Sequence, residues 1–369
     1  MIIWVKEVAG ILDVNKIMMW IKRDVEVKKL GAMEDASQGD IIIVSKAEVI
    51  DAEMLRMFRI IIYEEFFETI LQSVFQELDY AYDYYYLKNA MAKATNSTAN
   101  TIITGSSYGL LGIDENLLTH EVNLSLNSQD LYYSLKGVYE IYQQNQNIKK
   151  IVLCCGYYYF YSDLSQTKNA DEVERISRVY QPLFGDNHHA VLCPPRAAIL
   201  PDSHVFDIQG VTDGLAWQEY ERHYFHADRP RSEYAARMWK DASKCWHQLC
   251  EEEKEEAGRM RAHLHNKNRK RQSTYEENTR LFQEFISFCE QRAICPFVVV
   301  TPASKYYRKY FDSRFKDDFY AVLIQAEGTV HLLDLFDEDT FLEEDFNDMD
   351  HLSDSGARKM TAKVLELLQ

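Results

Sequence analysis

The sequence predicts an α/β fold in which helices cover both faces of a parallel β-sheet. From about residue 100 onward, short apolar runs alternate with stretches of helical periodicity or high charge. The apolar runs are continuous, which is typical of parallel strands buried on both faces. The chain of 369 residues, 46% hydrophobic, is long enough for one large domain or two ordinary ones. The predicted strands are TIITG (101–105), HEVNLSL (120–126), KIVLCCG (150–156), PFVVVTP (296–302) and TVHLLDL (329–335).

The first 95 residues are predicted to form a separate small α/β module. The run DIIIVSKAEVI (40–50) has the β-branched composition of a buried strand. From Asp51 to about Ala94 the apolar residues recur at helical spacing. The small, polar segment AKATNSTANT (92–101) is the candidate linker. We find no chemical motif in this module, so docking, specificity or dimerisation is its expected role.

Residues 96–369 are predicted to form the larger domain, and this domain contains a long insertion. Its third and fourth strands are separated by far more chain than one crossover helix needs. The insertion spans about residues 160–273 and includes a predicted helix from about 231 to 265. Asp202 and His204, in a loop of the insertion, are candidates for lining a substrate groove.

Charge and cysteine content exclude several classes of protein. With 41 basic and 58 acidic residues the net charge is −17, so neither nucleic acid nor an anionic membrane surface is an expected partner. The seven cysteines are scattered without a CxxC pair, which favours reduced thiols over a disulfide framework. No signal-peptide pattern opens the chain, and glutamates interrupt its most apolar stretch. A cytoplasmic protein without a transmembrane span is therefore expected.

Neither a metal nor a cofactor is expected from the sequence. The spacing of Gly105, Gly109 and Gly112 matches neither a phosphate-binding Walker loop nor the dinucleotide motif. Histidines occur close together as His188-His189 and as His263-Leu264-His265. Because no Cys, Asp or Glu accompanies either pair at ligand spacing, we interpret them as surface or packing histidines.

The segment TIITGSSYGLLGID places a serine-rich turn directly after an apolar strand. In a parallel sheet, functional groups gather at the carboxyl ends of the strands. A serine on the tight turn after Gly105 would point outward, next to backbone N–H groups able to hold the oxyanion that forms when a serine attacks an ester. Ser107 is the predicted nucleophile, and Ser106 is the rival.

The segment DFNDMDHLSDSGARKM near the other end of the chain supplies a histidine and two acids. A serine hydroxyl becomes a good nucleophile when an imidazole takes its proton, and an acid must fix the tautomer of that imidazole. His351 is the predicted base, and Asp348, three residues before it on one loop, is the predicted orienting acid. Asp350 is the rival acid. A loop histidine near a polar crevice packs little, so replacing His351 is expected to leave the fold intact.

Together these two motifs resemble those of the SGNH (GDSL-like) hydrolase superfamily. That family has a Gly-x-Ser block just after its first strand and an Asp-x-x-His block just before its last helix. Here the blocks read Gly105-Ser106-Ser107 and Asp348-Met349-Asp350-His351, followed by Leu352, Ser353 and Gly356. The resemblance covers about residues 100–369 and implies a three-layer, flavodoxin-like α/β/α sheet. The Gly-Ser-Ser block and the long insertion look most like the acyltransferase-type members linked to bacterial cell-surface polysaccharide.

The middle blocks depart from the family pattern, which supplies a Gly after the second strand and an Asn after the third as oxyanion donors. After the second strand, the backbone N–H of Ser128 or the side chain of Asn127 could serve beside the N–H of Ser107. After the third strand comes Gly156 and then three tyrosines, with no Asn. The candidate substrate contacts near this crevice are Tyr157, Tyr158, Lys305 and Tyr306.

The resemblance implies a serine-dependent O-acetyltransferase or esterase that acts on a carbohydrate or another acyl ester through an acyl-serine intermediate. Both activities use the same residues, so the sequence leaves them open. A second hypothesis is a non-catalytic module that binds a glycan or a partner on the same fold. A third assigns the main activity to residues 1–95. The oligomeric state is not predicted.

Overall fold

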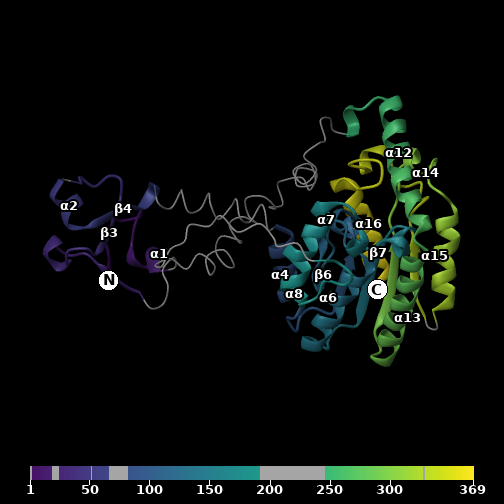
Figure 1. Cartoon of the computed structure of the whole chain (residues 1–369), viewed down its shortest axis with the longest axis horizontal. Helices are drawn as coiled ribbons and strands as arrows, with labels where there is room; N and C mark the ends of the chain where they lie inside the picture. The colour runs from purple at the N-terminus through teal and green to yellow at the C-terminus, as the bar shows by residue number, and fades with distance from the viewer. Residues whose placement is uncertain (1, 19–24, 51, 66–81, 192–245, 327–328) are drawn as a thin grey trace. The chain divides into compact units, whose positions relative to one another are not determined.

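The chain is α/β and contains two sheets whose strands are all parallel (Figure 1). The computed structural model describes residues 2–18, 25–50, 52–65, 82–191, 246–326 and 329–369. The chain divides into two compact units, and the described part of the first ends at Tyr85. Each unit is described by itself below.

The first unit is a four-stranded parallel sheet with strand order β2-β1-β3-β4. Its small core contains Trp4, Leu30, Ile42 and Val44. The indole of Trp4 donates a hydrogen bond to Asp40 Oδ2 at 2.9 Å, which fixes the chain at the start of β3. The elements are β1 (Ile2–Val5), α1 (Val14–Met18), β2 (Glu26–Lys29), β3 (Ile41–Val44), α2 (Ala52–Met57) and β4 (Arg59–Ile62).

The prediction for this unit is confirmed as α/β but is wrong in one element. Residues 59–62 form strand β4, in parallel register with β3, where helical spacing had predicted a continuous helix. The run Arg59–Ile62 contains three consecutive β-branched residues, which favour a strand whenever a neighbouring strand can pair with them. Tertiary pairing has therefore overridden the local periodicity. The residues between Phe66 and Ala81 lie outside the described ranges.

The second unit is built on a five-stranded parallel sheet with strand order β6-β5-β7-β8-β9. All five strands lie where the apolar runs predicted them. Every residue of β7 after Lys150 is buried, as expected for a strand covered on both faces. The strands are β5 (Thr101–Gly105), β6 (Glu121–Asn123), β7 (Lys150–Cys155), β8 (Cys295–Val300) and β9 (His331–Asp334).

Helices pack against both faces of this sheet (Figure 1). Met360 and Val364 of α16 pack on Ile103, Val152 and Val299, while the residues between these on each strand point to the opposite face. Helix α6 (Leu131–Gln144) packs beside α13 (Gln272–Gln291), and these two helices contact β5 and β8 respectively. The helices are α4 (Tyr82–Ala94), α5 (Ser107–Gly112), α6 (Leu131–Gln144), α7 (Ala170–Arg175), α8 (Gln181–Phe184), α12 (Glu251–Asn266), α13 (Gln272–Gln291), α14 (Lys305–Arg308), α15 (Arg314–Gln325) and α16 (Asp354–Leu367).

The predicted linker belongs to the second unit. The chain divides at Tyr85/Tyr86, inside α4, and so ahead of the boundary that composition had placed at residue 95. The buried side-chain amide of Asn145 donates to the carbonyls of Ala94, Asn96 and Ala99 at 2.9, 2.9 and 3.0 Å. The polar, helix-breaking residues after α4 thus form a turn, and hydrogen bonds from Asn145 fix this turn to the second unit.

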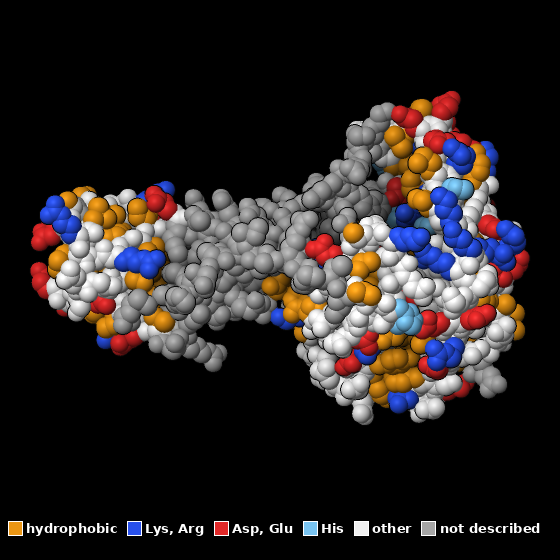
Figure 2. Space-filling view, in the orientation of Figure 1, with side chains coloured by type: hydrophobic (Ala, Val, Ile, Leu, Met, Phe, Trp, Pro, Cys, Tyr) orange, Lys and Arg blue, Asp and Glu red, His pale blue; other side chains and the backbone are white. Residues whose placement is uncertain are grey.

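The connection between β7 and β8 carries the predicted insertion. Its described part contains α7, α8, α12 and α13, and the helix predicted from about 231 corresponds to α12 where the chain is described. Asp202 and His204 lie outside the described residues. On the face shown in Figure 2, acidic and basic side chains of this unit are interspersed. None of the described helices combines the length and apolar content that a membrane span requires.

Candidate active site

The turn between β5 and α5 directs Ser107 toward His351. Gly105 has φ 144°, and a Cβ at this position would overlap the backbone carbonyl of Cys154, so the turn requires glycine. Ser106 is the N-cap of α5, and its Oγ accepts a hydrogen bond from Tyr108 N at 3.4 Å. Ser107 Oγ lies 2.8 Å from His351 Nε2. The two neighbouring serines therefore differ in role, one capping the helix and the other meeting the imidazole.

The loop before α16 holds His351 through Asp348. The Oδ1 atom of Asp348 accepts the backbone N–H groups of Asp350 and His351 at 2.9 and 2.8 Å. Both oxygens of this carboxylate also contact His351 Nδ1, at 3.1 and 3.0 Å. The loop is closed by a hydrogen bond of 2.8 Å from Asn347 N to His351 O. One carboxylate thus fixes both the loop and the orientation of the ring.

Asp350 is a buried counter-ion. Its Oδ1 lies 3.3 Å from His351 Nδ1 without hydrogen-bond geometry. Its Oδ2 accepts hydrogen bonds from the Tyr108 hydroxyl at 2.7 Å and from Arg261 Nε at 3.0 Å. Burial raises the pKa of Asp350, but the charges of Arg261 and His351 outweigh it and hold this pKa well below its usual range. Asp350 is therefore ionised beside the imidazole.

Aromatic side chains line a small cavity next to Asp350. The cavity, of about 10 Å³, has room for one water molecule and is lined by Tyr108, Gly156, Tyr158, Tyr307 and Asp350 among others. His265 lies next to it, stacked on Tyr158 with ring centroids 3.9 Å apart, and its Nδ1 is 2.6 Å from the Tyr307 hydroxyl. Burial, followed by the charge of Arg261, lowers the pKa of His265 well below 6.5, so this histidine is neutral.

The two acids shift the titration of His351. Burial lowers the pKa of His351, but the carboxylates of Asp348 and Asp350 outweigh it and raise this pKa to about 9. At neutral pH the imidazole is therefore protonated in the unliganded protein. It becomes a base for Ser107 only when that proton leaves, whether at higher pH or on a change in its surroundings.

The predicted oxyanion donors lie beside the serine turn. Leu126 N and Gln129 Nε2 both donate to the carbonyl of Gly105, at 3.3 and 3.1 Å, which places the segment after β6 against that turn. Within this segment Ser128 has a positive φ of 55° and is exposed. The side-chain oxygen of Asn127 is buried and has no hydrogen-bond partner among the described residues. The N–H of Ser107 opens α5 and so lacks a carbonyl of its own helix to bind.

The predicted substrate contacts are divided. Tyr158 borders the cavity beside Tyr108 and His265. Tyr157 is only 1% exposed and donates its hydroxyl to Asp334 at 2.6 Å, so it serves the sheet rather than a ligand. Tyr306 is buried and binds Glu251, at 2.8 and 2.9 Å, and Glu343.

Lys305 is exposed on α14. Its ammonium lies over the ring of Tyr306, 4.7 Å from the centroid, and 3.7 Å from Glu251. The contact with Glu251 joins α14 to α12. Lys305 therefore binds side chains of these two helices at the protein surface. Of the four predicted substrate residues, Tyr157 and Tyr158 both line the cavity beside Asp350, whereas Lys305 and Tyr306 do not.

Sequence reasoning missed the residues that surround Asp350. Arg261 comes from α12 within the insertion, and Tyr108 is one position past Ser107. Charged helices of this kind usually present their arginines to solvent, so no local signal distinguishes Arg261 from Arg259 two residues earlier. Tyr108 belongs to the serine block, and the partner of its hydroxyl, Asp350, lies 242 residues further along the sequence.

His188 and His189 are a packing and a surface histidine, as the sequence predicted, but acidic side chains that the sequence did not place near them lie beside both rings. Asp163, His188 and His189 can each place one ligand atom within 4.8 Å of the others, and Glu277 contacts both rings. The acids come from distant parts of the chain, so spacing along the sequence could not reveal them. His265 packs against Tyr158 and Tyr307, as a packing histidine does.

Comparison with known proteins adds little about activity. A family model for an uncharacterised family matches residues 222–369, which is less than half of the chain. The match includes Asp348 and His351 and stops short of Ser107. No curated protein matches the chain.

Proposed function

We propose that this protein is a serine-dependent esterase or O-acyltransferase of the SGNH type, acting on a carbohydrate through an acyl-serine intermediate. The proposal rests on one observation, which is the hydrogen-bonded series from Ser107 through His351 to Asp348, with distances of 2.8 and 3.0 Å. This is the arrangement that activates a serine hydroxyl.

The topology supports the same family. The strand order β6-β5-β7-β8-β9 is, in chain order, 2-1-3-4-5, which is the flavodoxin-like order. The serine directly follows the first strand of this sheet, and the acid and histidine directly precede the last helix. In SGNH enzymes the serine block likewise lies near the start of the domain and the histidine block near its end.

The reaction proceeds in two steps. Ser107 Oγ attacks the acyl carbonyl carbon while its proton passes to His351 Nε2, and backbone N–H groups beside the turn hold the oxyanion. The tetrahedral intermediate collapses, the C–O bond to the alcohol breaks, and His351 returns the proton to that alcohol. A sugar hydroxyl or water then loses a proton to His351 and attacks the acyl-serine carbonyl. The second tetrahedral intermediate collapses, the bond between the acyl carbon and Ser107 Oγ breaks, and His351 returns the proton to that oxygen. The carbohydrate class rests on the sequence resemblance.

The Ser107→Ala variant is expected to lose all labelling by a fluorophosphonate probe, because the oxygen of an activated serine attacks the phosphorus of the probe, displaces fluoride and forms a phosphonate ester. In-gel fluorescence of the full chain measures this. The matched control is Ser106→Ala, which removes the N-cap of α5 and costs about 1 kcal/mol of stability but keeps the nucleophile. Wild-type protein that stays unlabelled across the pH range would favour the non-catalytic binding module instead.

The rate of labelling is expected to rise with pH and to reach half of its maximum near pH 9. The reason is that the carboxylates of Asp348 and Asp350 raise the pKa of His351 to about 9, and only the neutral imidazole accepts the serine proton. The Asp350→Asn variant removes one of these charges, so its profile is expected to move to lower pH. A profile centred near pH 6.5 in wild type would contradict the assignment.

The same shift affects stability in the opposite direction. Because the pKa of His351 is higher in the folded state than its ordinary value of 6.5, the stabilisation from the ion pair is fully present below pH 6.5. It is lost as the pH rises through 9. The thermal melting temperature should therefore be measured at each pH used for labelling, so that a loss of folded protein is not mistaken for a loss of reactivity.

A further inference from the structure

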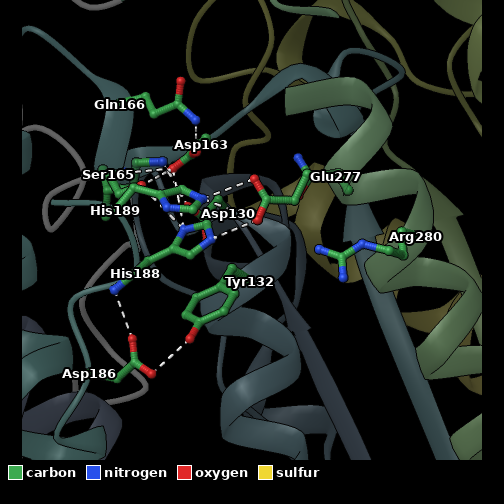
Figure 3. A network of polar contacts seen from close by, with 12 residues as sticks. Asp130, Tyr132, Asp163, Ser165, Gln166, Asp186, His188, His189, Glu277 and Arg280 are labelled. Carbon is green, nitrogen blue, oxygen red and sulfur yellow. Dashed lines mark hydrogen bonds and ion pairs between the residues drawn. The ribbon is translucent and has the colours of Figure 1, made fainter. Parts of the chain in front are cut away.

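A second cluster of ligand-type side chains lies in the insertion between β7 and β8 (Figure 3). Three segments that are distant in the sequence contribute to it. Asp163 is the N-cap of the 3₁₀ turn Leu164–Gln166, His188 and His189 follow α8, and Glu277 projects from α13. The catalytic steps proposed above use none of these residues.

The contacts within the cluster are short and converge on the two imidazoles. His188 Nδ1 lies 3.6 Å from Asp163 Oδ1, and His188 Nε2 lies 3.3 Å from Glu277 Oε1. His189 Nε2 lies 3.1 and 3.0 Å from the two oxygens of Glu277. The two rings lie against each other with centroids 3.9 Å apart. As Figure 3 shows, Glu277 reaches both rings from the same side.

Glu277 selects the tautomer of both histidines. A carboxylate accepts hydrogen bonds, so each Nε2 that faces Glu277 carries the proton when the ring is neutral. The lone pair of each ring is then on Nδ1, and for His188 this nitrogen is the one that faces Asp163. An acid that binds the outer nitrogen of a histidine is the usual second partner of a metal-binding imidazole.

The cluster is held in place on one side and open on the other. His188 adopts a positive φ of 50° and donates its N–H to Asp186 Oδ1 at 2.7 Å. Its ring stacks on Tyr132 with centroids 3.8 Å apart. The side chains of Asp163 and His188 are 2% and 7% exposed, whereas that of His189 is 48% exposed. An ion can therefore reach a largely preformed site from the side of His189.

The structure assigns a divalent metal site to Asp163, His188 and His189, and we propose Zn²⁺ as the ion that these ligands suit best, with Glu277 orienting both rings. Two imidazoles and a carboxylate are common ligands of zinc. With bonds of about 2.0–2.1 Å, tetrahedral ligand atoms lie about 3.4 Å apart, close to the 3.6 Å between His188 and Asp163. The bound ion joins the 3₁₀ turn Leu164–Gln166, the loop after α8 and, through Glu277, helix α13.

The site is tested by titrating the full chain, after treatment with a chelator, with Zn²⁺ in a calorimeter and with Co²⁺ in a visible spectrometer. The expected result is one equivalent of either ion per chain. The His189→Ala variant should lose this binding, because it removes an exposed ligand and little packing. The Glu277→Gln variant should bind about 10–100-fold more weakly, as loss of a partner of the ligands does.

The matched control is His120→Ala, which removes another exposed histidine and should bind as wild type does. Zn²⁺ should also raise the melting temperature of wild type and of His120→Ala but not of His189→Ala. Wild-type protein that binds neither ion would overturn the assignment. Binding unchanged in His189→Ala would also overturn it, since the ion would then occupy another group such as Asp348, Asp350 and His351.

Discussion

The His351→Gln variant is expected to react with a fluorophosphonate roughly 10⁶-fold more slowly than wild type, a loss of the size seen when a triad histidine is removed. His351 Nε2 is the group 2.8 Å from Ser107 Oγ, and glutamine cannot take the serine proton at this position. Stopped-time labelling at pH 9 measures the rate constant, because wild-type His351 is then half neutral.

The matched control for this variant is His265→Gln. His265 is also buried and lies in the same region, but its Nδ1 contacts the Tyr307 hydroxyl and not the serine. Its labelling rate should stay within a few-fold of wild type. If His351→Gln reacted at the wild-type rate in a folded protein, another group would have to activate Ser107, and the proposed mechanism would be abandoned.

Glutamine is preferred to alanine because His351 is buried and is expected to contribute to the stability of the fold, although it lies in a loop. The sequence had led us to expect that its replacement would leave the fold intact. The residue is only 2% exposed and lies between two carboxylates, with its ring 5.3 Å from that of Tyr108. Alanine at this position would leave a cavity and the charge of Asp350 without its second cation, so a melting curve must accompany every His351 variant.

The Arg261→Met variant is expected to lower the free energy of unfolding by about 3 kcal/mol. Removing one partner of a buried ion pair usually costs roughly 3–5 kcal/mol, and this pair should fall at the lower end. Asp350 is 1% exposed and would keep its charge with only His351 to balance it. The side chain of Arg261 is 31% exposed, and water can therefore reach part of the vacated space, which reduces the loss. Urea unfolding at pH 7 measures the change.

A second substitution separates charge from packing. In the double variant Arg261→Met/Asp350→Asn the uncompensated carboxylate is gone, so most of the lost stability should return. The matched control is Arg259→Met on the same helix, whose partner Glu256 is exposed and whose unfolding curve should stay close to wild type. If the double variant were as unstable as the sum of the two single variants, the pair would not act through its charge.

The sheet of the second unit was predictable chiefly because its central strands β5, β7 and β8 carry continuous runs of apolar or β-branched residues, whereas the edge strands β6 and β9 are shorter and partly polar. TIITG and KIVLCC place β-branched residues on both faces, and their short length and β-branched content favour a buried strand over a buried helix segment. In the first unit β2 has the sequence Glu26-Val-Lys-Lys29, which has no such signal, and it is a strand because β1 offers it a partner.

The contacts between Ser107, His351 and Asp348 were predictable from the sequence, whereas the residues that surround them were not. Ser107, Asp348 and His351 belong to short motifs whose order along the chain identifies them. By contrast, the positive charge beside Asp350 belongs to Arg261, on a helix whose charged sequence predicts exposure to solvent. The acids beside His188 are Asp163 and Glu277, which are distant from it in the sequence. Such contacts depend on how helices of a long insertion pack, which no local pattern specifies.

The way Asp348 is bound has a consequence for how this site can change. Its Oδ1 receives two backbone N–H groups as well as the imidazole, so the conformation of the loop and the direction of the ring are thermodynamically one cooperative unit. Glutamate, one carbon longer, could not satisfy all three donors from the same backbone position. Asp348 should therefore show strong, non-additive mutational coupling with its neighbours in the loop, Asp350 included.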